Sequence, residues 1–255
     1  NFDDWRIIIG GRYTDNQLSG QKLTPRLALV HTIDEFQSIK ALYSTGFNSP
    51  NPTQTSVFLP GDVIGNGNLT AEVVKTFDIA YSYAKSNVSF VANIYSLEAE
   101  DFIIRRYSEE VDSVSFFNEG NYKRKGAELD LQVAFDKGQL FANFAYQHNG
   151  NKLVEGDLDA FRIPKITLSV GGSIQLGENH TLGAEISHIG ARQNIDGYTT
   201  VNLRYSVYLA SFEVFALARN LFNTDIINPN ITAQNSTLVS AEDGVNYQLG
   251  LKYYF

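Results

Sequence analysis

The stretch GVNYQLGLKYYF, residues 244–255, closes the chain and alternates between two kinds of side chain. Its apolar and aromatic members stand at every second position: Val245, Tyr247, Leu249, Leu251, Tyr253 and Phe255. Such a period of two is typical of a β-strand with one apolar and one polar face. In a chain built of similar strands it favours a transmembrane β-barrel, because lipid outside and water inside require opposite polarities on the two faces.

Composition limits the classes to which the protein can belong. The chain has 255 residues and no linker-like run, so we expect a single domain, 1–255. Hydrophobic residues make up 43% of the chain, yet no uncharged apolar run approaches the roughly 20 residues of a membrane helix. Any membrane crossing must therefore use strands. The net charge of −8 argues against nucleic acid as a partner.

Two residue types are missing from the sequence. The absence of cysteine excludes thiolate chemistry and cysteine-based metal sites. Methionine is absent even at position 1, where Asn1 leads directly into a strand-like pattern. We therefore expect a mature product or a fragment of a longer protein.

Twelve segments read as strands, most of them near the length of about 10 residues that a tilted strand needs to cross a bilayer. They are 4–13, 24–33, 37–46, 70–84, 88–105, 118–135, 139–148, 163–176, 180–191, 198–209, 212–220 and 244–255. The clearest rows, which we expect to face lipid, are Ile166, Leu168 and Val170, and Val201, Leu203 and Tyr205. Segment 212–220 is apolar on both faces, so its orientation stays ambiguous.

The connections between these segments alternate in length. Those after Ile33, Ala84, Phe135, Leu176 and Leu209 have two to four residues, whereas most of the others exceed ten. Short periplasmic turns and long external loops are typical of outer-membrane barrels, while a sandwich has no reason to sort its loops in this way. The predicted fold is therefore all-β: an antiparallel transmembrane meander of about twelve strands.

Four motifs occur in a fixed order along the chain. YSTGFNSP at 43–50 is followed by GNLTAE at 67–72. NEG at 118–120 precedes KGAE at 125–128, and RNLFN at 219–223 stands before the last strand. These motifs resemble the strand-end signatures of TonB-dependent outer-membrane receptors, and Phe255 resembles their aromatic terminus. Asn48 departs from that pattern, where the family often has Arg, and so does Ala71, where it often has Pro.

The resemblance implies that the chain is the carboxyl-terminal part of a barrel of about 22 strands, without the plug and the first strands. Such a receptor binds a scarce nutrient at the bacterial surface, as siderophore-iron, cobalamin, haem or a glycan, and imports it with energy from TonB. The implied partners are TonB, outer-membrane lipid, the small nutrient and the barrel-assembly machinery, which would recognise Tyr253 and Phe255. The alternative is a complete twelve-stranded passive channel whose first and last strands pair with each other.

Five charged residues face the interior in the predicted register: Arg26, Lys40, Glu128, Asp130 and Arg204. The cations among them could attract an anionic chelate. The same side chains could equally line a wet lumen or bond to the plug, because charge is permitted on a water-filled interior. We expect the ligand itself to be bound from outside by the loops at 48–69 and 221–243.

We expect neither an enzyme nor a bound cofactor or metal. The chain has no nucleophile elbow and no zinc-helix motif, and its four histidines are scattered: His31, His148, His180 and His188. The acidic run at 98–112 lacks the spacing of a calcium loop, so we expect a solvated loop there. A soluble all-β binding protein is a third possibility, and it would require polar residues on the faces assigned to lipid.

Overall fold

The computed structural model describes residues 4–16, 20–150, 163–192, 195–229, 238–240 and 244–255. They form two compact units, which we describe separately. Unit 1 consists of Asn1–Tyr81, Asn93–Gly126 and His148–Asp157, and unit 2 of Ser82–Ala92, Ala127–Gln147 and Leu158–Phe255. None of the described residues forms a helix long and apolar enough to span a membrane.

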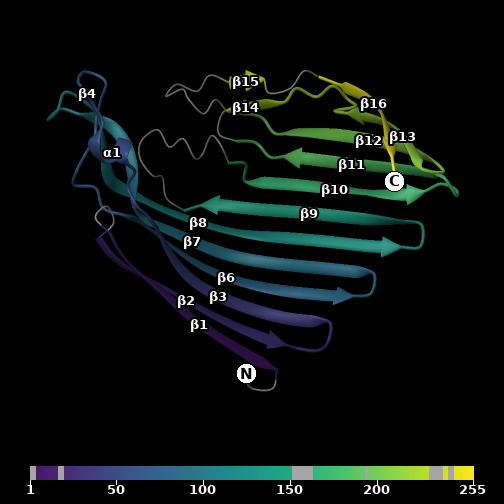
Figure 1. Ribbon diagram of the computed structural model, residues 1–255, viewed down its shortest axis with the longest axis horizontal. Helices are drawn as coiled ribbons and strands as arrows, with labels where there is room; N and C mark the ends of the chain where they lie inside the picture. The colour runs from purple at the N-terminus through teal and green to yellow at the C-terminus, as the bar shows by residue number, and fades with distance from the viewer. Residues whose placement is uncertain (1–3, 17–19, 151–162, 193–194, 230–237, 241–243) are drawn as a thin grey trace. The chain divides into compact units, whose positions relative to one another are not determined.

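Antiparallel strands account for nearly all of the described secondary structure (Figure 1). The strands of the main meander are β1 (Trp5–Asn16), β2 (Gly20–Thr32), β3 (Gln37–Asn48), β6 (Glu72–Lys85), β7 (Val88–Ser108), β8 (Ser113–Phe135), β9 (Gly138–Asn149), β10 (Ile166–Gln175), β11 (His180–Ile189), β12 (Tyr198–Leu209), β13 (Phe212–Arg219) and β16 (Asn246–Tyr253). The shorter elements are α1 (Pro52–Ser56), β4 (Phe58–Leu59), β5 (Val63–Ile64), β14 (Ile227–Pro229) and β15 (Leu238–Ser240).

Neighbours in sequence are neighbours in the sheet. The order is β1-β2-β3-β6-β7-β8-β9-β10-β11-β12-β13-β16, so the predicted antiparallel meander of twelve strands is confirmed. Within the described residues β1 pairs with β2 alone, and β16 pairs with β13 alone. The pairing of first and last strands that a complete twelve-stranded channel requires is not part of this order.

The predicted lipid-facing rows are confirmed as exposed or half-buried rather than packed in a closed core. In unit 2, Val170 pairs with Ala142 on one side and Ile186 on the other, so the rows of neighbouring strands merge into one apolar face. Val170 is 43% exposed, and Tyr205 is 41% exposed. The other members of the rows are exposed at Ile166 and Leu168 and half-buried at Val201 and Leu203. So large an exposed apolar face excludes a soluble sandwich and suits contact with lipid.

Two of the expected long loops are instead strand. β7 has 21 residues and β8 has 23, and the turn between them is residues 109–112. The acidic run at 98–112 is therefore strand as far as Ser108, and only its last four residues form the turn. Similarly, β1 ends at Asn16 and β2 begins at Gly20. The sequence misleads here because backbone hydrogen bonds continue a strand whether or not its side chains form an apolar row.

Apart from Ala28 on β2, the buried apolar residues of unit 1 lie in the segment between β3 and β6 and on β7 and β8. Pro50 is fully buried there. The other apolar residues of this small core are Val63, Leu69, Ala71, Ala99, Ile103 and Tyr122. The core therefore holds the connection between β3 and β6 against the sheet, rather than lying beneath a second layer of strands.

Candidate functional site

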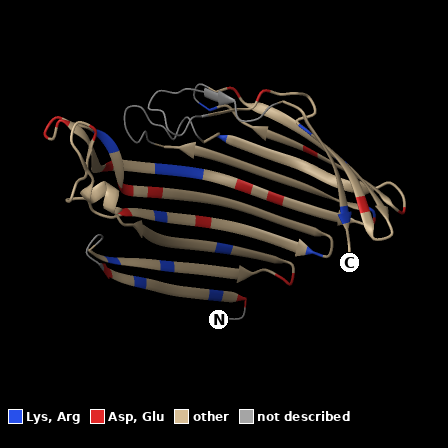
Figure 2. Ribbon diagram, turned by 45° about the horizontal axis from the view of Figure 1, so that its top comes forward, with Lys and Arg blue, Asp and Glu red and all other residues tan. Residues whose placement is uncertain are grey.

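The second face of unit 2 is polar and is fixed by the strand register. Glu185 pairs with Asn202 across β11 and β12, and with Gly171 across β10 and β11. Ser169, two residues before Gly171 on β10, donates a hydrogen bond of 2.9 Å to Glu185. Figure 2 shows that acidic and basic positions are scattered along the strands and that the turn between β7 and β8 is acidic. The Glu185 carboxylate is therefore hydrogen-bonded on the polar face of unit 2.

Arg26 and Lys40, two of the predicted interior residues, lie on one face of unit 1. Lys40 pairs with Val30, which stands four residues from Arg26 on β2, so alternation puts both cations on the same side. Arg26 pairs with Ser44, whose hydroxyl lies 2.9 Å from the hydroxyl of Thr76. Both cations are exposed. Their placement fits the predicted register, and their role in ligand binding stays a prediction.

The other three predicted residues lie in unit 2. Glu128 is exposed, and Asp130 accepts a hydrogen bond of 3.4 Å from the Gln132 amide. Arg204 donates to the Glu213 carboxylate at 2.6 Å, so its charge is already paired within the sheet. A role in ligand binding stays a prediction for these residues as well.

Glu213 is the centre of a hydrogen-bond network at the end of the sheet. Its side chain is only 3% exposed and accepts hydrogen bonds from Arg204, the Ser206 hydroxyl at 2.8 Å and the Tyr254 hydroxyl at 2.7 Å. The Lys252 ammonium is 3.7 Å away. Buried carboxylates are tolerated when they are paired and fully hydrogen-bonded, as this one is. The network ties β12, β13 and the final residues together.

Phe215 is an apolar side chain on the polar face, and a glycine explains its place. Its ring lies over Gly250 on β16, where a Cβ atom would stand 2.2 Å from the ring. The Arg204 guanidinium covers the ring at 4.0 Å from its centroid. A ring that crosses a strand glycine in this way pins the register of the two strands.

The terminal aromatic residues divide between the two faces. Tyr254 turns to the polar face and meets Glu213. Tyr253 contacts Phe212 at a centroid distance of 4.9 Å and Phe255 at the same distance. Tyr253 and Phe255 are both exposed, so the two residues proposed as an assembly signal are accessible, and that role stays a prediction.

The connection between β3 and β6, predicted as a ligand-binding loop, is folded against β8. Asn51 caps α1 with a capping box that it shares with Gln54. β4 pairs with β5, and β5 pairs in parallel with β8 through Val63 and Val114. The Asn66 amide also donates to the Phe116 carbonyl at 2.9 Å. The connection between β3 and β6 is therefore held in one conformation against β8.

The motif residues of this region act as clamps between strand ends. Glu72 is 8% exposed and accepts hydrogen bonds from the Ile103 backbone at 2.8 Å and from the Asn48 amide at 2.9 Å. Asn118 bonds both backbone groups of Thr70 and donates to the Asp101 carbonyl at 2.6 Å. The residues at which the motifs are most recognisable thus bind backbone groups that the loop would otherwise leave unpaired.

The Asn-Leu-Phe-Asn motif forms a similar clamp in unit 2. Asn220 is 3% exposed, has a φ of 50°, and joins the Thr224 backbone through both its amide nitrogen and its amide oxygen. The Asn223 amide oxygen accepts from the Val245 backbone at 3.1 Å. Asparagine is favoured in this left-handed conformation because its short side chain can bond locally. The clamp fixes where β16 begins.

An ion pair braces the long hairpin of β7 and β8 beyond the apolar rows. Arg106 forms two hydrogen bonds with Glu119, of 2.8 and 2.5 Å, and lies over the Phe117 ring. The Arg106 guanidinium holds the pKa of Glu119 below its ordinary value. The pair therefore contributes stability above that ordinary pKa and loses it as the pH falls through the lowered one.

One further cation on the polar face was missed in the sequence. The Arg124 guanidinium lies over the Tyr122 ring at 4.9 Å from its centroid. Its Nε donates to the Tyr122 hydroxyl and, at 3.2 Å, to the Asn149 amide oxygen. In the sequence Arg124 is hidden in the run Lys123-Arg124-Lys125, and only alternation along β8 separates it from its neighbours.

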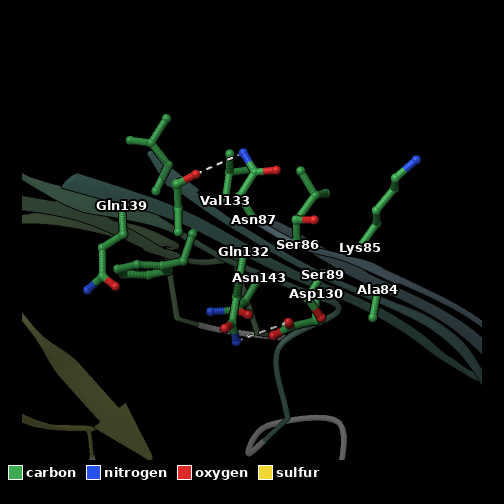
Figure 3. Close-up of a pocket in the computed structure, with 14 residues that line it drawn as sticks. Ala84, Lys85, Ser86, Asn87, Ser89, Asp130, Gln132, Val133, Gln139 and Asn143 are labelled. Carbon is green, nitrogen blue, oxygen red and sulfur yellow. Dashed lines mark hydrogen bonds between the residues drawn. The ribbon is translucent and has the colours of Figure 1, made fainter. Parts of the chain in front are cut away.

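A hollow of about 550 Å³ lies in unit 2 beside the turns between β6 and β7 and between β8 and β9. Figure 3 shows Asp130, Gln132 and Asn143 together within it, while Lys85 extends away. The Asn87 amide donates to the Ala134 carbonyl at 3.0 Å. The hollow offers amide and carboxylate groups to a polar partner.

Comparison with known proteins identifies the family. Residues 1–223 match the family described as TonB dependent receptor-like, beta-barrel. The chain belongs to this family. TonB-dependent receptors are outer-membrane proteins of Gram-negative bacteria, so these strands are membrane-spanning and the exposed apolar rows face lipid. No curated protein sequence matches the chain.

Solved TonB-dependent receptors share its fold. The siderophore receptor PirA from Pseudomonas aeruginosa is 17% identical with a TM-score of 0.74, over 97% of this chain and 43% of that one. A mutant ferric enterobactin receptor, PfeA, from the same organism in complex with enterobactin is 16% identical with a TM-score of 0.77, over 98% and 43%. The FrpB iron transporter from Neisseria meningitidis is 13% identical with a TM-score of 0.74, over 99% and 43%. The chain thus spans less than half the length of these receptors.

Proposed function

We propose that this chain is the carboxyl-terminal part of the barrel wall of a receptor that binds a scarce nutrient at the cell surface and imports it with energy from TonB. The observation that carries the proposal is the family match over residues 1–223. The folded segment between β3 and β6 supports it, because a surface built on α1, β4 and β5 can present side chains to an external ligand.

A ferric siderophore is the first candidate for the nutrient. Several of the similar structures are described as siderophore, ferric enterobactin or iron receptors, although one is described as a copper transporter. A polar face that carries separated cations such as Arg26, Lys40 and Arg124 also suits a large anionic complex.

Deletion of the gene in the native host tests this proposal. On medium in which one ferric siderophore is the sole iron source, we expect growth of the parent strain and loss of growth in the deletion strain, restored by the intact gene. Growth should remain equal on freely available iron. If deletion changes growth on no siderophore, haem, cobalamin, glycan or copper source, nutrient import is the wrong function.

A further inference from the structure

Arg124 lies on the polar face at the level where β8 and β9 end their pairing. Its partner Asn149 is the last residue of β9, and the Gly150 backbone donates to the Lys123 carbonyl at 2.8 Å, so Arg124 and Asn149 stand opposite each other. Alternation along β9 puts Asn149 on the same face as Asn143, which belongs to the polar face through its pairing with Ser169. The side chain therefore faces the interior, beyond the apolar rows.

Two contacts hold the guanidinium in one orientation. The guanidinium carbon lies over the Tyr122 ring, 4.9 Å from its centroid, and Tyr122 is itself 6% exposed and donates to Asn149 at 2.7 Å. The second contact is made by the Nε–H group, which donates to both the Tyr122 hydroxyl and the Asn149 amide oxygen. A guanidinium fixed in this way loses little further freedom when it binds, and preorganisation of this kind favours affinity.

The opposite edge of the guanidinium is available. Among the described residues, neither terminal nitrogen of Arg124 forms a hydrogen bond or an ion pair, in contrast to Arg106 and Arg204, whose terminal nitrogens bind carboxylates. A fork of two parallel N–H donors matches the paired oxygens of a carboxylate, a phosphate or a catecholate. A single ammonium lacks that geometry.

We propose that Arg124 is an anion-binding residue that gives the receptor a preference for anionic over uncharged ferric complexes. The inference rests on the proposed function and adds a ligand class and a specificity-determining residue. Lys123, next in sequence, provides the contrast, because its ammonium pairs with Glu98 at 2.5 Å and it points to the other face.

The test is a binding titration of the complete purified receptor with two probes of different charge. Ferric enterobactin, a tris-catecholate trianion, and ferrichrome, an uncharged trihydroxamate, are each titrated against wild type and variants. We expect wild type to prefer the trianion. Arg124→Gln should weaken that binding by about 10- to 100-fold, as expected for the loss of a charge-assisted bidentate contact, and leave ferrichrome binding unchanged.

Matched variants separate the site from a general loss of charge. Arg124→Lys keeps the charge but not the paired donors, so its affinity for the trianion should lie between those of wild type and Arg124→Gln. If the Gln variant does not fold, the Lys variant still tests the proposal. Tyr122→Phe removes the hydroxyl that holds Nε and should weaken trianion binding less than Arg124→Gln. Lys123→Gln removes a neighbouring charge on the other face and should bind like wild type.

Three results would overturn the proposal: wild type that prefers ferrichrome or binds neither complex, Arg124→Gln with unchanged trianion affinity, or an equal loss in Lys123→Gln. The growth experiment keeps this failure distinct from that of the proposed function. If deletion abolishes growth on a siderophore while Arg124→Gln binds the trianion normally, only the assignment of Arg124 is wrong.

Discussion

Replacing Glu213 with alanine is expected to destabilise the complete receptor by about 1.5 to 3 kcal/mol, the range for a hydrogen bond to a charged group. The carboxylate is almost fully buried and accepts hydrogen bonds from Arg204, Ser206 and Tyr254. Its loss leaves these donors without their acceptor and leaves two cations, at Arg204 and Lys252, without a counter-charge. Denaturant unfolding of the purified receptor in detergent measures the change.

Glu178→Ala is the matched control for Glu213→Ala. Glu178 is an exposed carboxylate in the turn between β10 and β11, so its loss should change the free energy of unfolding by less than about 0.5 kcal/mol. We also expect less Glu213→Ala than wild-type receptor in the outer membrane, because the network holds the final strand. Equal unfolding curves for the two variants would contradict the role given to Glu213.

Replacing Glu72 with alanine is expected to release the connection between β3 and β6. The change removes the acceptor of the buried Ile103 backbone N–H and of the Asn48 amide, at a cost of about 1 to 3 kcal/mol for a buried donor left unpaired. The effect should be local, because the clamp joins strand ends. Limited proteolysis of intact cells should therefore show faster cleavage within residues 49–71.

Glu72→Gln keeps an acceptor oxygen for one of the two donors and should show a smaller increase in cleavage. Glu110→Ala removes an exposed carboxylate in the turn between β7 and β8 and should be cleaved at the wild-type rate. Protection of residues 49–71 in Glu72→Ala as complete as in wild type would show that the clamp does not hold the segment.

The strand count and the two-faced strands were predictable because lipid imposes a period of two on every crossing. That period fails on β13, where Phe215 is apolar and yet lies on the polar face. The residues that make room for Phe215 and cover it belong to other strands: Gly250 lies against the ring on β16, and the Arg204 guanidinium lies over the ring from β12. Alternation within one strand carries no information about them.

The lengths of β7 and β8 were not predictable by the same reasoning. Beyond Ile94 neither face needs to be apolar, so the pattern ends although the hydrogen-bond ladder continues to Ser108. The charged residues there indicate a loop in the sequence, whereas Arg106 and Glu119 form an ion pair between the two strands.

The site was predicted only in part, because function here depends on which side chains are already occupied. Sequence reasoning treated Arg204 as an available interior cation, but the structure pairs it with Glu213. It passed over Arg124, whose availability follows from the way Tyr122 and Asn149 hold its Nε. The motifs at Glu72, Asn118 and Asn220 did point to important residues, and their observed contacts are those of strand-end clamps.

Energy coupling is the most direct test of the proposed function, and it distinguishes an active receptor from a passive channel. The measurement is the initial uptake rate of a radioactive ferric complex that supports growth only when the gene is present, in native host cells with and without TonB. We predict that cells lacking TonB still bind the complex at their surface but accumulate none of it. Equal accumulation in both strains would contradict the account and favour passive diffusion.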